Sequence, residues 1–101
     1  MRFGLSEQQY AYLQENLFVP LSRIPTDVWI FGSRATGKQR EFSDVDILIS
    51  RKNPVIVKLV RDISETFENG NFPFKVDIVF DEDLADSYRS SVDRDKCQIS
   101  A

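Results

Sequence analysis

Histidine is absent from this chain of 101 residues, and cysteine occurs once, at Cys97. Without histidine the chain cannot build a Ser-His-Asp triad, a Cys-His pair or an imidazole metal site. A single cysteine excludes an intrachain disulfide and a cysteine-rich zinc site. Any metal that this chain holds must therefore be bound by oxygen, which selects hard cations such as Mg²⁺ or Mn²⁺.

Long apolar runs and an excess of basic residues are also lacking. No run approaches the roughly 20 apolar residues that a membrane span requires, and the first residues do not resemble a signal peptide. We therefore expect a cytoplasmic protein without a membrane partner. The formal net charge of −3 argues against a general nucleic-acid binder, whose contact surface is usually basic.

What the chain does contain is the composition of one folded domain, which we place at residues 1–101. Hydrophobic residues make up 42% and charged residues 29%, so disorder over most of the length is excluded. A chain of this length builds one modest core.

Hydrophobic periodicity predicts helices that alternate with strands. The predicted helical segments begin after Ser6 and end before Pro20, cover residues 33–38 and 54–69, and follow a cap at Asp83. The predicted strands are residues 28–31, 44–50 and 74–80. The first strand is expected to be buried on both faces, with Trp29 and Phe31 in the core, and the tail from Asp93 has no clear period. The order indicates an α/β (α+β) fold with a small mixed sheet and its helices on one face.

Three aspartates are expected on the face that the helices leave open. Asp44 and Asp46 are two residues apart on one strand, which places both carboxylates on the same side, about 7 Å apart at their Cα atoms. Asp77 stands in the middle of the strand 74–80, where aspartate is disfavoured. If the two strands are neighbours, the three carboxylates converge. Such crowded charges recruit cations, and two Mg²⁺ ions would form the clamp used for phosphoryl-group displacement.

A glycine and a serine precede this cluster, at the point where the first strand turns into a short helix. Gly32 allows the backbone to approach a phosphate, and the Ser33 hydroxyl adds a hydrogen-bond donor. Arg34, Lys38 and Arg40 bring positive charge, but a charged surface turn explains Arg34 as well as phosphate contact does, and explains Lys38 and Arg40 better. The sequence therefore predicts a phosphate site at Gly32, Ser33 and Arg34 beside a metal site.

The segment GSRATGKQREFSDVDI resembles the signature of the DNA-polymerase-β-like nucleotidyltransferase superfamily, in its minimal (MNT) branch of the MntA-like antitoxin type. The pattern is Gly32-Ser33, ten residues, and then Asp44-Val45-Asp46, with a later acidic residue that Asp77 matches. The resemblance implies the polymerase-β-like palm fold. It also implies that Asp44, Asp46 and Asp77 bind Mg²⁺, that Asp77 helps to activate the attacking hydroxyl, and that Gly32 and Ser33 hold the triphosphate.

The resemblance further implies a protein adenylyltransferase that moves AMP from ATP to a tyrosine of a HEPN-type toxin. Two alternatives stay open: a binding module that neutralises a partner by occlusion, and a transferase for small molecules such as aminoglycosides. All three carboxylates are present, which favours an enzyme, and the absence of walls for a small acceptor favours a protein substrate. The acceptor, the preferred nucleotide and homo-oligomer formation are left open by the sequence.

Overall fold

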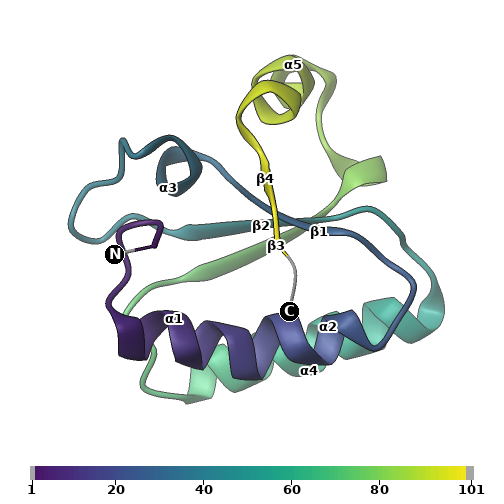
Figure 1. Ribbon diagram of the computed structural model, residues 1–101. Coiled ribbons are helices and arrows are strands. Elements are labelled where there is room, and N and C mark those ends of the chain that lie inside the picture. The colour runs from purple at the N-terminus through teal and green to yellow at the C-terminus, as the bar shows by residue number, and fades with distance from the viewer. Residues whose placement is uncertain (1, 100–101) are drawn as a thin grey trace.

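The computed structural model describes residues 2–99 and consists of a four-stranded sheet with helices on both sides (Figure 1). The helices are α1 (Glu7–Leu13), a π-helical segment (Gln14–Phe18), α2 (Val19–Ser22), α3 (Ser33–Thr36), α4 (Pro54–Asn69), a 3-10 turn (Asp81–Asp83) and α5 (Asp86–Asp95). The strands are β1 (Val28–Phe31), β2 (Val45–Ile49), β3 (Val76–Phe80) and β4 (Cys97–Gln98). Within residues 2–99, no helix is long and apolar enough to cross a membrane.

The sheet is mixed, as predicted, and its strand order is β3-β2-β1-β4. β2 pairs antiparallel with β1 and parallel with β3, while β4 pairs antiparallel with the outer edge of β1. The three predicted strands are confirmed within one or two residues at each end. β4 lies in the tail, where no sequence pattern indicated a strand.

The core lies between one face of the sheet and the helices α1, α2 and α4, which Figure 1 shows below the strands. The alternation in β2 is as predicted, because Val45, Ile47 and Ile49 are fully buried on this face. Helix α4 supplies the opposing layer with the buried side chains Ile56, Val60, Ile63 and Phe67. Its start is also as predicted, since the Asn53 side chain accepts a hydrogen bond from the Ile56 amide at 2.9 Å.

The first helical stretch does not end before Pro20, as the sequence suggested, but continues through it to Ser22. A π-helical turn precedes the proline, and the Val19 amide donates to the carbonyl of Gln14, five residues back. Proline lacks an amide proton and normally breaks the bonding between residues i and i−4. Because the π turn has already shifted the backbone hydrogen bonding, the helix accommodates Pro20 and continues.

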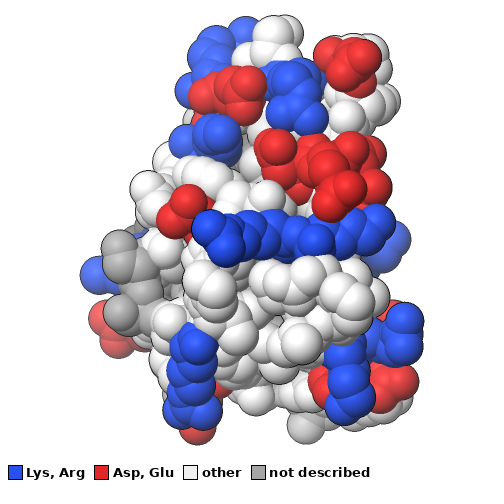
Figure 2. All heavy atoms as spheres, turned by 90° about the vertical axis from the view of Figure 1, so that its right-hand side faces the viewer, with Lys and Arg blue, Asp and Glu red and all other residues white. Residues whose placement is uncertain are grey.

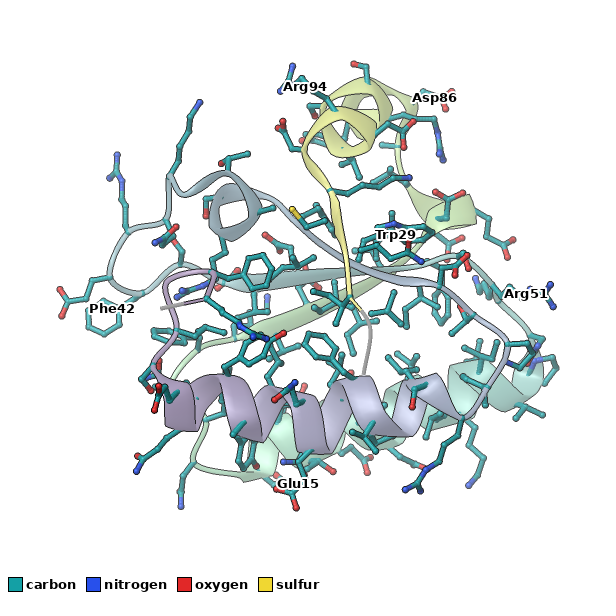
Figure 3. All side chains as sticks on the ribbon, in the orientation of Figure 1. Glu15, Trp29, Phe42, Arg51, Asp86 and Arg94 are labelled. Carbon is teal, nitrogen blue, oxygen red and sulfur yellow. The ribbon has the colours of Figure 1, made fainter. Side chains whose placement is uncertain are left out.

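The opposite face of the sheet is not left free of helices, which corrects the prediction that all helices cover one face. Helix α5 stands over this side, and β4 runs from it back to the sheet (Figure 1). Trp29 points toward this side rather than into the core (Figure 3), and the Lys96 ammonium lies 4.5 Å from the centre of its ring. Trp29 and Phe31 are both only partly buried, so β1 is fully buried on one face alone.

Asp83 does not cap the last helix, because its carboxylate is paired elsewhere. It lies 2.9 Å from the Lys52 ammonium, and α5 begins three residues later with Ala85 at its N-cap. Figure 2 shows this side of the molecule, where acidic and basic side chains are neighbours. A second ion pair, between Arg89 and Asp81 at 3.2 Å, ties α5 to the turn that follows β3.

Candidate active site

Asp46 and Asp77 are brought side by side by the parallel pairing of β2 with β3. The two residues are direct register partners, and Phe31 of β1 is opposite Asp46 on its other side. All three belong to the sheet face that α5 overlooks, since side chains alternate along each strand. Asp46 is partly buried in this row, whereas Asp77 is exposed. The predicted convergence of these two carboxylates is therefore present.

Asp44 lies just before β2 and is exposed. It is close enough for its charge to act on Asp46, although it is not part of the paired strand. Among residues 2–99, no three Asp, Glu, His or Cys side chains are grouped closely enough to hold a metal ion. The structure thus brings two of the predicted ligands together and leaves Asp44 outside β2, one residue before its start.

The pair of carboxylates has the donor chemistry that a hard cation requires. Burial, together with the charges of Asp77 and Asp44, raises the pKa of Asp46 to about 6, from an ordinary value of 3.8. Lys75 and Arg34 act weakly in the opposite direction. A divalent cation between these oxygens would offset the repulsion, so the side chains present fit such an ion.

The turn at Gly32 and Ser33 lies directly against this pair. Gly32 has φ 74°, a conformation that favours glycine, and a side-chain carbon built at this position would collide with Oδ2 of Asp46. Ser33 then begins the four-residue helix α3, which ends at Gly37 with φ 75°. In the structure, the absence of a side chain at Gly32 leaves room for the Asp46 carboxylate, and the predicted approach to a phosphate stays a prediction.

Arg34 is not positioned to contact phosphate groups, which corrects its predicted role. Its side chain is only 2% exposed. The guanidinium donates to the carbonyl of Ser43 from Nε (3.0 Å) and Nη2 (2.8 Å), and to the carbonyl of Phe3 from Nη1 (3.0 Å). It also stacks on Phe74 at 4.3 Å. Burial lowers its pKa, while Asp44 and Asp46 act to raise it. Arg34 therefore holds the residue immediately before Asp44 in place.

Helix α5 adds a wall to the site that the sequence did not assign to it. Tyr88 and Val92 of α5, with Leu84 just before the helix, line a pocket of about 330 Å³ together with Asp46 and Asp77. Periodicity could identify them as one face of a helix, but not what that face overlooks.

Comparison with known proteins gives consistent matches. Residues 21–99 match the family model described as "Polymerase beta, Nucleotidyltransferase". A curated relative, "Probable protein adenylyltransferase MntA" of Haemophilus influenzae, is 40% identical over 53 residues, which cover 52% of this chain and 46% of that protein. The match thus spans slightly less than half of the relative. A chain in the "Crystal structure of the toxin-antitoxin with AMP-PNP" has the same fold, with a TM-score of 0.53 and 20% identity over 96% of this chain and 75% of its own.

Asp46→Asn is expected to stabilise the metal-free protein at neutral pH by about 1–2 kcal/mol, a range that allows for solvent screening of a partly buried carboxylate. Because the folded-state pKa lies above the ordinary value, the folded state binds the proton more tightly. Wild-type stability should therefore fall as the pH rises from about 4 to about 6. Urea unfolding in EDTA at pH 4 and pH 7.5 measures this.

The difference in the free energy of unfolding between Asp46→Asn and wild type should vanish near pH 4. Glu65→Gln, on the exposed side of α4, is the matched control and should change stability by less than about 0.5 kcal/mol. A loss of stability in Asp46→Asn at pH 7.5 would show instead that the fold depends on this carboxylate.

Arg34→Met is expected to lower the free energy of unfolding by about 2–3 kcal/mol, because it leaves the carbonyls of Phe3 and Ser43 without their donor. Thermal unfolding should show a drop of roughly 8–24 °C. Arg40→Met, an exposed substitution in the neighbouring loop, should have little effect. A fully stable Arg34→Met variant with weakened ATP binding would restore the phosphate contact predicted from the sequence.

Proposed function

This chain belongs to the polymerase beta nucleotidyltransferase family, and from this premise we propose that it transfers AMP from ATP to a hydroxyl group of a partner protein. The observation that carries the proposal is the pairing of Asp46 with Asp77, with the Gly32 turn against Asp46. In this arrangement a site for cations adjoins a turn that offers backbone and hydroxyl groups to phosphate.

Asp44, Asp46 and Asp77 are the residues that would hold Mg²⁺, in the form of two ions, with Mn²⁺ as a substitute. Bound cations would neutralise the triphosphate and favour displacement at its α-phosphorus. Gly32 and Ser33 then bind the phosphate groups through the backbone and the Ser33 hydroxyl. Arg34 contributes by fixing the Ser43 carbonyl, and with it the start of the strand that bears Asp44 and Asp46.

Asp77 is the exposed member of the pair and can be reached by an incoming hydroxyl group. Its carboxylate accepts the hydroxyl proton while the hydroxyl oxygen bonds to the α-phosphorus. The bond between the α-phosphorus and the oxygen bridging to the β-phosphate breaks, and pyrophosphate leaves. AMP is thereby joined to the acceptor oxygen.

The acceptor is a side chain of another protein, in this proposal a tyrosine of a HEPN-type toxin. Asp44 and Asp77 are exposed at the surface, so a side chain presented by a partner can reach them. The loop before Asp44 also carries Phe42, which is 74% exposed and points away from the molecule (Figure 3). Two likenesses support the same acceptor class: the curated relative is named as a protein adenylyltransferase, and the structural neighbour is part of a toxin–antitoxin.

ATP binding is expected to require a divalent cation, because unneutralised carboxylates at Asp46 and Asp77 repel a triphosphate. Calorimetry should show binding in Mg²⁺ or Mn²⁺ and its loss in EDTA. Ser33→Ala should weaken binding only modestly, since backbone amides of the same turn remain. Equal affinity in EDTA would contradict the metal site, and unchanged affinity in Ser33→Ala would remove that hydroxyl from it.

Transfer is tested by co-expression with the product of the adjacent gene, followed by intact-mass spectrometry of that partner. We expect one or more added AMP units on a tyrosine of the partner. Asp46→Asn and Asp77→Asn should abolish the addition, because each removes a charge that the reaction needs. Asp62→Asn, an exposed position on α4, is the matched control and should leave the addition unchanged.

The binding-module alternative gives a different result in the same experiment. If Asp46→Asn neutralises the partner as well as wild type, with no change in the partner's mass, the protein acts by occlusion and the transfer proposal fails.

A further inference from the structure

The pocket between the sheet and α5 is lined by both acidic and apolar side chains. One wall carries the carboxylates of Asp46 and Asp77, and the other carries Leu84, Tyr88 and Val92. Its volume of about 330 Å³ is at the lower end of the range for small-molecule sites. The side that adjoins the reaction centre is acidic, and the α5 side is mainly apolar, with Ser91 and Asp95 as its polar members.

The charges of the pocket determine which part of a nucleotide it suits. Among the described residues that line it, none is lysine or arginine, while Asp95 adds a further carboxylate. Asp95 is neutralised by Arg94, with contacts of 2.9 and 3.0 Å. Because no lysine or arginine lines the pocket, phosphate groups would find no opposite charge on the α5 side, whereas an uncharged planar group needs none there.

Tyr88 is the large aromatic side chain of this wall and is 63% exposed. It lies on a fixed helix, because Val92 is only 6% exposed and Arg89 donates to the carbonyl of Asp81 at 2.8 Å. An exposed aromatic ring on a fixed helix loses little freedom when a second ring stacks on it. Such stacking is the usual way in which proteins bind nucleic-acid bases without reading their sequence.

We propose that Tyr88, with Leu84 and Val92, forms the subsite for the base of the nucleoside triphosphate. The inference rests on the proposed function, which places the phosphate groups at Gly32, Ser33 and the carboxylates. The base is covalently tied to those phosphate groups, so a neighbouring apolar pocket takes it up at high effective concentration. A side chain of a partner protein lacks this link and instead reaches the exposed Asp77 from solvent.

The test compares ATP with inorganic tripolyphosphate, which has the same three phosphate groups without the nucleoside, each with Mg²⁺, by calorimetry. Wild type should bind ATP more tightly than tripolyphosphate. Tyr88→Ala should weaken the affinity for ATP about tenfold, within the range for a lost base–aromatic stack, and leave the affinity for tripolyphosphate unchanged. Tyr88→Phe should retain wild-type affinity for both ligands. Val55→Ala, which truncates a 69% exposed side chain on α4, is the control.

Other outcomes separate the base subsite from the proposed function. If Tyr88→Ala lost affinity for ATP and for tripolyphosphate equally, the subsite would be overturned and Tyr88 would have a structural role. Unchanged ATP affinity combined with reduced transfer would also overturn it, and would assign the pocket to the acceptor. Failure of wild type to bind either ligand would overturn the proposed function itself, together with the subsite.

Discussion

The parallel pairing of β2 with β3 forces Asp46 and Asp77 into one row, and the rest of the site depends on this contact between like charges. Gly32 comes close to Asp46 because it carries no side chain, so the carboxylate is crowded from two sides. Burial, together with the charges of Asp77 and Asp44, raises the pKa of Asp46 to about 6, so that ionising this carboxyl in the folded protein costs free energy. Hydrophobic burial on the opposite face of the sheet offsets this free energy, because Val45, Ile47 and Ile49 are fully buried against the helices.

Arg34 is the second constraint, and among residues 2–99 it is the one buried charged side chain. It bonds the carbonyls of Phe3 and Ser43 and stacks on Phe74, so it connects the N-terminal segment with the approaches to β2 and β3. The two carboxylate-bearing strands are therefore anchored to one guanidinium. This explains how an arginine that follows the Gly32–Ser33 turn can be important to the site through its contacts within the protein.

Local patterns predicted the elements well where one signal dominates. Asn53 and Pro54 begin α4, and the alternation in β2 identified the buried face. The errors occurred where a local signal has two physical solutions. Pro20 usually ends a helix, but here it follows a π turn that has already changed the bonding. Asp83 is a good cap by residue type, yet Lys52, distant in sequence, binds its carboxylate instead.

The sequence by itself determined that Val45, Ile47 and Ile49 share the buried face of β2, because side chains alternate with a period of two along any strand. It also limited the ligands that a metal could find in this chain almost entirely to oxygen, since the chain has no histidine and one cysteine. Only the tertiary structure decided that Asp77 pairs with Asp46, that Arg34 is buried and that α5 overlooks the carboxylates. These features are contacts between distant segments, and periodicity reports which face a residue occupies but not what packs against that face.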